Sequence, residues 1–308
     1  MNTQENSERF IIRQRPSEEE LRAVRKGLKD YNKMHPHGEL DIPPPDISLV
    51  LKNKEGKIVG GVITSMLTGV MHLEVLWVDK QYRRRGYGRN LVLEAERIGK
   101  EKGYTASQTW TFSFQGPDFY RSIGYKLMGI YDGYTDKITE YIFMKKLDTN
   151  HQTLHENLTQ MDGFSIHQDK SEESMKILHT GLHEHVTEHV GKLRDKNPEI
   201  QIQLVIKNKE DQVIGGLIAY TTLKTIHTEQ VWIHETYRGQ GYGKELLINA
   251  EHIAQEHGCI SGLVNVLSFQ NLDFFQNNGY EIFGISDGYP LPIKEYFLIK
   301  RFRTQNKP

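Results

Sequence analysis

The sequence predicts a mixed α/β fold that is built twice along the chain. Three observations carry this prediction: residues 47–147 recur 155 positions later as residues 202–302, strand-like and helix-like segments alternate within each copy, and each copy holds one glycine-rich turn between a strand and a helix. Counted without a gap, 40 of the 101 aligned pairs are identical. A repeat of this length corresponds to a whole domain, not to the roughly 20–50-residue unit of a solenoid.

The repeat divides the 308 residues into two domains joined by a linker. We place the N-terminal domain at 1–147, the linker at 148–162 and the C-terminal domain at 163–308. Two domains agree with the usual size of about 100–200 residues per domain. A monomer with two packed domains and a homodimer both remain open.

Each copy begins with a short strand and a helix. The strands are expected at Phe10–Arg13 and Phe164–His167, and a Ser-Glu-Glu sequence at 17–19 or 171–173 opens the helix. This sequence places a cap and acidic charges where the helix dipole favours them. Three strands follow, with a Lys-Asn-Lys-Glu hairpin turn between the first two. They are expected at 47–52, 58–63 and 72–78, and at 202–207, 213–218 and 227–233.

A longer helix follows the glycine-rich turn. In the first copy, Leu91, Ala95 and Ile98 recur at helical spacing and Gly103 ends the helix. In the second copy, Leu246, Ala250 and Ile253 have the same spacing and Gly258 ends the helix. A strand, a short helix at Phe119 or Phe274 and two more strands complete each copy. The order strand, helices, three strands, helix, strand, helix, strand, strand predicts α+β-type layers, with a mixed and mostly antiparallel sheet flanked by helices. A doubly wound nucleotide fold would need more alternating strand-helix units.

The composition narrows the class of protein. The formal net charge is −1 and no long basic run occurs, so a nucleic-acid partner is not expected. The single cysteine, Cys259, excludes an internal disulfide framework and fits a reducing compartment. Residues 1–8 lack the apolar core of a signal peptide, and no stretch approaches the roughly 18 apolar residues of a membrane span. We therefore expect a cytoplasmic protein without a membrane partner.

The glycine-rich turn has the chemistry of a phosphate cradle. Arg83-x-x-Gly86-x-Gly88 follows Val78 by five residues, and Arg238-x-x-Gly241-x-Gly243 follows Ile233 in the same way. Glycines let the backbone bend closely, so that successive N–H groups and the helix N-terminus converge on an anion. A turn that merely ends a strand is the alternative interpretation.

The surroundings of this turn resemble the Gcn5-related N-acetyltransferase (GNAT) superfamily. The resemblance rests on the strand, the turn, the helix and the downstream Phe119-Tyr120-x-x-x-Gly124-Tyr125, which returns as Phe274-Phe275-x-x-x-Gly279-Tyr280. A bacterial subfamily of poorly defined substrate is similar in the following segments: Leu76-Trp77-Val78, Tyr82-Arg83, Gly86-Tyr87-Gly88, Phe112-Ser113-Phe114-Gln115 and Phe119-Tyr120. The resemblance covers nearly all of both copies. It implies two tandem acyl-CoA N-acyltransferase domains that transfer acetyl from acetyl-coenzyme A to an amine of a small molecule or a protein.

The resemblance also implies which residues hold the coenzyme. Backbone N–H groups of the turn would bind the pyrophosphate, and the preceding strand would pair with the pantetheine arm and polarise the thioester carbonyl. In the first copy these residues are Leu76, Trp77, Val78, Arg83, Arg84, Arg85, Gly86, Tyr87, Gly88, Arg89 and Ser113. In the second copy they are Val231, Trp232, Ile233, Arg238, Gly239, Gln240, Gly241, Tyr242, Gly243, Lys244 and Ser268. The superfamily commonly has an asparagine where this chain has Ser113 and Ser268.

The three arginines of the first turn have two interpretations. The cluster Arg83-Arg84-Arg85 can neutralise coenzyme phosphates as point charges. A solvated basic turn is the alternative for Arg84 and Arg85.

Glu74 and Glu229 are the candidate general bases. An amine with a pKa near 10 is protonated at neutral pH and must lose a proton before it attacks the thioester. Both acids occupy the same position of a central strand, where apolar neighbours would raise the pKa of an unpaired carboxyl. A salt-bridged or water-exposed structural acid is the alternative.

Tyr120 is the candidate general acid, because in the superfamily a tyrosine at this position often protonates the departing thiolate. The second copy has Phe275 there, which favours the N-terminal domain as the catalytic one. A thiol with a pKa of about 8.5 leaves with little help, so the second site is weakened and not excluded. Tyr120 can instead be an aromatic packing residue. Catalysis in the C-terminal domain, whose Arg-Gly-Gln-Gly turn is closer to the commonest family form, and a non-catalytic coenzyme-binding or scaffolding protein are the alternatives.

Three further features are given less weight. The predicted helix carries His179, His183, His185 and His189, including two i, i+4 pairs, but a solvated face is favoured and no metal is expected. Cys259 aligns with Tyr104, so the copies do not share an acyl-enzyme route and direct attack in a ternary complex is preferred. The repeated Asp-Gly-Tyr at 132–134 and 287–289 either lines the acceptor site or forms a tight turn with a packed tyrosine.

Overall fold

The computed structural model describes residues 10–34, 47–135, 137–147, 163–196, 198–290 and 292–302. The predicted linker at 148–162, the N-terminal segment 1–8 and the loop 35–46 lie outside the described residues. No helix of the described part is both long and apolar enough to cross a membrane.

Both copies of the repeat form the predicted series of elements, which confirms the mixed α/β fold. The first copy forms β1 (Ile11–Gln14), α1 (Glu18–Lys33), β2 (Ser48–Lys52), β3 (Ile58–Leu67), β4 (Val70–Val78), α2 (Tyr87–Glu101), β5 (Ala106–Phe112), α3 (Pro117–Ser122), β6 (Lys126–Thr135) and β7 (Ile138–Lys146). The second forms β8 (Ser165–Gln168), α4 (Glu172–Lys196), β9 (Gln201–Lys207), β10 (Val213–Thr222), β11 (Thr225–Ile233), α5 (Tyr242–Glu256), β12 (Ser261–Leu267), α6 (Leu272–Asn277), β13 (Glu281–Ser286) and β14 (Glu295–Arg301). Short 3-10 turns, η1 (Lys80–Tyr82) and η2 (Glu235–Tyr237), precede the glycine-rich turns.

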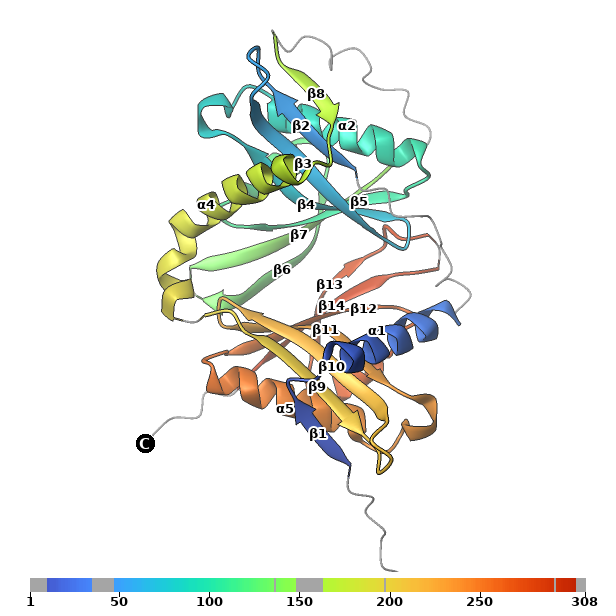
Figure 1. The fold of residues 1–308 in the computed structure, drawn as a ribbon. Helices are drawn as coiled ribbons and strands as arrows, with labels where there is room; N and C mark the ends of the chain where they lie inside the picture. The colour runs from blue at the N-terminus through green and yellow to red at the C-terminus, as the bar shows by residue number, and fades with distance from the viewer. Residues whose placement is uncertain are drawn as a thin grey trace, which may run out of the picture.

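The fourteen strands form one sheet in the order β1-β9-β10-β11-β12-β14-β13-β6-β7-β5-β4-β3-β2-β8. Neighbours are antiparallel except for the parallel pairs β4–β5 and β11–β12. The copies join where β13 pairs with β6 through Gly284 and Gly129. A Cβ on Gly284 would lie 2.9 Å from the Cα of Gly129, so this close approach needs glycine. Figure 1 shows the two halves on either side of this junction.

The first strand and helix of each copy are exchanged between the halves. β1 pairs with β9 and α1 packs on β9, β10 and β11, whereas β8 pairs with β2 and α4 packs on β3 and β4. Figure 1 shows the dark blue α1 against the orange strands and the yellow α4 against the blue and teal strands. The boundaries 1–147 and 163–308 therefore remain a proposal about the sequence repeat, because each packed half includes a segment from the other copy.

Equivalent glycines let both exchanged helices lie against a tryptophan. A Cβ on Gly27 of α1 would lie 2.1 Å from the Cε2 atom of Trp232, and a Cβ on Gly181 of α4 would lie 2.2 Å from the same atom of Trp77. Any larger residue would overlap the indole ring. The repeated glycine is thus a packing requirement of the exchange.

Polar contacts also fix α1 to the opposite half. Ser17 and Glu20 form the predicted cap as a capping box. Glu20 additionally accepts from Lys207 of β9, with 2.7 Å between Nζ and Oε1. The hydrogen bond from Lys207 and the one from the Ser17 backbone lower the pKa of the Glu20 carboxyl to about 2. The first turn of α1 is therefore tied by charge to the C-terminal half.

The junction between the halves buries two equivalent polar networks. Tyr134 donates to Glu140 at 2.7 Å and lies 3.4 Å from Nε2 of His227 across the junction. Tyr289 donates to Glu295 at 2.9 Å and lies 3.5 Å from Nε2 of His72. The tyrosines of both Asp-Gly-Tyr segments thus pack between the halves, outside the described linings of the two clefts beside the glycine-rich turns.

Candidate active site

Two equivalent clefts open where the parallel strands of each half separate. β5 runs beside β4 only from Val70 to His72, and β12 runs beside β11 only from Thr225 to Thr228. Beyond these points β4 and β11 keep their antiparallel partner on one edge and face a cleft on the other. The N-terminal cleft has a volume of about 780 Å³ and the C-terminal one about 730 Å³. An extended ligand can hydrogen-bond to the exposed strand edge, as an added strand would.

A β-bulge brings the candidate base to each cleft. The β3–β4 register passes from Ile63↔Val75 to Thr64↔Leu73, so Glu74 is the extra residue of the bulge. The β10–β11 register shifts in the same way and leaves Glu229 as the extra residue. A bulge re-aims a side chain relative to the regular alternation of a strand. Both carboxylates line their clefts.

The two carboxylates differ in their electrostatic surroundings. Glu74 is exposed and accepts a hydrogen bond from the Ser65 hydroxyl. Partial burial raises the pKa of Glu229, and the charge of Arg25 from the exchanged helix α1 opposes this rise. The expectation of a raised pKa is therefore supported at Glu229.

Each glycine-rich turn ends in a helix N-terminus without a side-chain cap. Gly86 and Gly241 are the N-cap residues of α2 and α5, with φ of 83° and 90°, and no side-chain hydrogen bond caps either described helix. The first N–H groups of an α-helix have no partner inside the helix. They are left to bind an anion at the positive end of the helix dipole. Gly86, Tyr87, Gly88 and Arg89 line the first cleft, and Gly241, Tyr242, Gly243 and Lys244 line the second.

The basic residues of the turns have different tasks. Arg83 donates through Nε to the carbonyl of Val78 at 2.8 Å, and Arg238 does the same to Ile233 at 3.0 Å. These bonds tie the turn to the end of the preceding strand, so each arginine shapes the turn besides lining the cleft. Arg84 lines the first cleft in a left-handed conformation, with φ of 65°, where the second copy has Gly239.

Four of the predicted coenzyme-binding residues lie outside the described linings of the clefts. Arg85 lies over the Tyr82 ring, 5.8 Å from its centroid, and Gln240 donates to the Thr236 carbonyl at 3.2 Å. Ser113 and Ser268 bond through their backbone N–H to Thr139 and Lys294, both at 2.8 Å. These serines tie the segment after β5 to β7, and the segment after β12 to the residue before β14. The strand residues Leu76, Trp77 and Val78, and Val231, Trp232 and Ile233, do line the clefts.

Tyr120 lines the N-terminal cleft and is buried at its inner wall. Burial raises the pKa of its hydroxyl to about 12, while a hydrogen bond with Thr109 opposes the rise. The hydroxyl is therefore protonated at neutral pH and has a proton to donate. The second copy replaces both members of this pair by apolar residues, Phe275 and Val264, which also line their cleft.

Each cleft is completed by the exchanged helix, which was not predicted from the sequence. Leu182 and His185 of α4 line the N-terminal cleft, and Leu28 and Tyr31 of α1 line the C-terminal one. The Gly-Leu pairs at 27–28 and 181–182 repeat in the two helices, which indicates that both helices have the same role. The pairs do not indicate on which half each helix packs.

Cys259 is removed from both clefts. It is a buried free cysteine, and burial raises the pKa of its thiol to about 12. Since the thiolate is the nucleophile, this residue has little capacity to form an acyl-enzyme.

The comparison with known families decides the class of protein. The sequence model of the acetyltransferase (GNAT) family matches residues 13–125 and again residues 165–280. The chain belongs to the GNAT acetyltransferase family. It is a tandem GNAT N-acetyltransferase, and acetyl-coenzyme A is its co-substrate. The resemblance found in the sequence is therefore confirmed.

Relatives of this GNAT protein match about one copy of the repeat. The Blasticidin-S acetyltransferase of Streptomyces morookaense is 35% identical over 95 residues, covering 30% of this chain and 70% of the relative. An acetyltransferase of Agrobacterium fabrum is 26% identical over 83 residues, covering 27% of this chain and 61% of the relative. The crystal structure of an acetyltransferase from Bacillus cereus is 26% identical with a TM-score of 0.42, covering 44% of this chain and 96% of that chain.

Proposed function

We propose that this GNAT protein transfers acetyl from acetyl-coenzyme A to a primary amine by direct attack in a ternary complex, and that its N-terminal cleft carries the reaction. One observation carries the proposal: Glu74, Tyr120 and the uncapped N-terminus of α2 line the same cleft. The C-terminal cleft has the equivalent acid and helix, but Phe275 in place of the tyrosine.

Each part of the N-terminal cleft has a task in the proposed reaction. The N–H groups at the start of α2 hold the pyrophosphate, and the free edge of β4 pairs with the pantetheine arm. A strand N–H polarises the thioester carbonyl as charge develops on its oxygen. Glu74 accepts a proton from the ammonium form of the acceptor, and the neutral amine attacks the carbonyl carbon. Tyr120 donates its proton to the sulfur as the carbon–sulfur bond breaks, and coenzyme A leaves as the thiol. The second proton of the acylated nitrogen then passes to the Tyr120 oxygen, directly or through water, which leaves a neutral amide and a neutral tyrosine.

The acceptor is a small molecule or a protein. The relative named Blasticidin-S acetyltransferase supports a small-molecule acceptor. The residues of the exchanged helix, Leu182 and His185, supply the acceptor side of the proposed site.

Catalysis in the C-terminal cleft is the second candidate. The raised pKa of Glu229 favours it, because a general base works best when its pKa approaches the working pH. Phe275 has no proton to give, so the thiolate would leave unassisted there.

Release of coenzyme A by the full-length chain, measured with a panel of amines, tests the assignment. Glu74→Gln is expected to lower kcat by at least about 100-fold, as loss of a general base does. The matched variant, Glu229→Gln, is expected to leave kcat unchanged. The reverse result would move the chemistry to the C-terminal cleft, and no release by the parent with any amine would favour a non-catalytic scaffold.

A further inference from the structure

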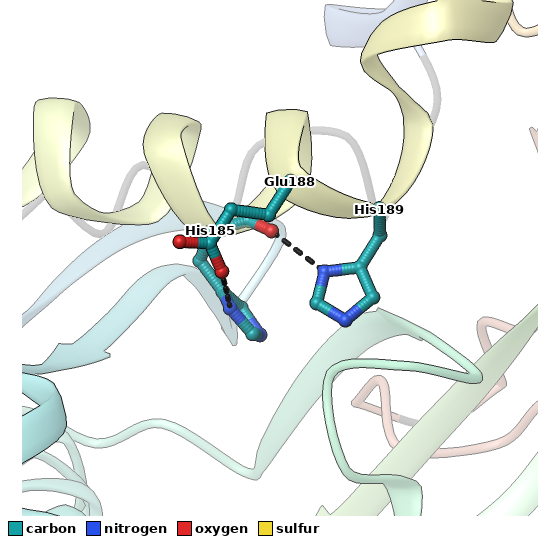
Figure 2. A group of neighbouring side chains, drawn as sticks. All are labelled: His185, Glu188 and His189. Atoms are coloured by element: carbon teal, nitrogen blue, oxygen red, sulfur yellow. Dashed lines mark hydrogen bonds and ion pairs between the residues drawn. The ribbon is translucent and has the colours of Figure 1, made fainter.

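The exchanged helix α4 carries a cluster of metal-ligating side chains at the mouth of the N-terminal cleft. His185, Glu188 and His189 occupy positions i, i+3 and i+4, which lie on one face of a helix. Their ligand atoms all lie within 4.8 Å of one another. Figure 2 shows the three side chains projecting from the same side of α4. His185 also lines the cleft, so the cluster borders the proposed acceptor side.

The two imidazoles are prepared for coordination by their neighbours. His189 bonds through Nδ1 to the carbonyl oxygen of His185 at 2.8 Å, which leaves its Nε2 atom for a metal (Figure 2). A ring nitrogen bonded in this way fixes the orientation and tautomer of a metal-bound histidine. Phe114 stacks on the His189 ring, with 4.6 Å between centroids and 7° between planes. This ring is thus held on both its edge and its face.

The rings of His185 and His189 lie next to each other, with 4.8 Å between their centroids. The Glu188 carboxylate lies 4.0 Å from Nδ1 of His185 and adds the negative charge that such a site needs (Figure 2).

We infer that His185, Glu188 and His189 bind a divalent transition metal ion of the zinc class. Two imidazoles and one carboxylate form a common ligand set for such an ion, with a further position open to water or a ligand. Ligand atoms of one zinc ion lie at most about 4 Å apart, so the side chains must close by about 1 Å through small rotations. The exposed side chain of Glu188 can make this movement by rotating toward the two imidazoles.

The other copy of the repeat lacks two of the three donors. At the offset of 154, His185 corresponds to Tyr31 and Glu188 to Met34, whereas His189 corresponds to His35, which lies outside the described residues. Tyr31 lines the C-terminal cleft and lies under the guanidinium of Arg238, 4.7 Å from ring centroid to Cζ. The inferred metal site is therefore a property of the N-terminal cleft alone among the described parts of the two clefts.

Cobalt binding by the full-length chain tests this inference without acetyl-coenzyme A or an amine, so its outcome is independent of the proposed reaction. After treatment with a chelator, the chain is titrated with Co²⁺ and its visible absorption is recorded, with Zn²⁺ as the competitor. The expected result is a cobalt band that saturates at one ion per chain and is abolished by Zn²⁺. His185→Ala and His189→Ala are expected to weaken binding by at least about tenfold, because even groups that only orient a ligand cost about 10–100-fold when replaced.

His179→Ala and His183→Ala are the matched controls, since both residues are exposed histidines of the same helix outside the cluster. They are expected to leave the cobalt band unchanged. Equal melting temperatures of all variants in chelator establish that the helix is intact. The inference is overturned if the parent gives no cobalt band, or if the control variants weaken the band as much as His185→Ala and His189→Ala do.

Discussion

Glu140 and Glu295 occupy equivalent positions on β7 and β14, but different numbers of donors hold them. Glu295 accepts from Gln108, Asn265 and Tyr289, at 2.8, 3.2 and 2.9 Å. Glu140 accepts from Tyr134, and burial raises its pKa to about 7. A buried carboxylate is stabilised by the hydrogen bonds that it accepts. The same strand position therefore holds a carboxyl with three hydrogen-bond donors in one copy and a carboxyl with one such donor in the other.

Glu140 makes the stability of the chain depend on pH. Its pKa rises from 4.5 to about 7 on folding, so its contribution is fully present below pH 4.5 and is lost as the pH rises through 7. Its neighbour His227 stays neutral over this range, because burial lowers the pKa of that imidazole to about 3. Glu140→Gln is expected to lessen the fall in the free energy of unfolding between pH 5 and pH 8 by about 2–3 kcal/mol. Denaturant unfolding at both pH values measures this, and an unchanged slope would contradict it.

At the next scale, helices α2 and α5 present the proposed anion sites, and the residues that begin them depend on backbone conformation. A Cβ on Gly86 would meet no atom within 4 Å, so glycine is needed there for its φ of 83° alone. A left-handed residue other than glycine costs about 1–2 kcal/mol. The same reasoning applies to Gly103 at the other end of α2, where φ is 87° and the space is also open.

Gly86→Ala and Gly103→Ala therefore form a matched pair. Both are expected to lower the free energy of unfolding by about 1–2 kcal/mol. Only Gly86→Ala is expected to disturb the N–H groups that face the N-terminal cleft. With one acetyl-coenzyme A expected in each cleft, this variant should lower the affinity of one of the two sites by about tenfold. Calorimetric titration measures both equivalents. Equal affinities for the two variants would argue against the turn as the pyrophosphate site.

The exchanged helix α4 offers a second test at the scale of an element. Gly181→Ala would drive a Cβ into the Trp77 ring, and overpacking of this kind typically costs about 1–3 kcal/mol. Gly191→Ala on the same helix meets the Thr187 side chain at 3.2 Å, so it is expected to change stability by less than about 1 kcal/mol. Thermal unfolding compares them. Equal melting temperatures would contradict the described packing of α4 on the N-terminal half.

At the scale of the whole molecule, the repeat predicts the fold of each half but not the partner of each element. The order of strands and helices followed from periodicity and turn residues, and the structure confirms it. The exchange could not be predicted, because β1 and β8 have the same sequence pattern and either can complete either sheet. The connections that lead from α1 into β2 and from β7 into β8, residues 35–46 and 148–162, lie outside the described residues.

The candidate site could be predicted to a similar extent. The Gly86 and Gly241 turns and the strand acids were visible as repeated residue types at fixed spacing, and the structure brings them to the two clefts. The bulges at Glu74 and Glu229 leave no clear sequence signature, since they arise from the register of two strands. His185 and Tyr31 enter the clefts through the exchange, so no pattern within one copy could indicate them.

The central claim is that one of two similar clefts carries the acetyl transfer. The most direct measurement is kcat for coenzyme A release by full-length Tyr120→Phe and Phe275→Tyr, with the parent as reference and saturating acetyl-coenzyme A. Tyr120→Phe is expected to lower kcat by about 10–100-fold, at or below the low end of the range for a general acid because a thiol leaves readily. Phe275→Tyr is expected to leave kcat unchanged. Parental kcat in Tyr120→Phe, together with a changed kcat in Phe275→Tyr, would contradict the claim and move the reaction to the C-terminal cleft.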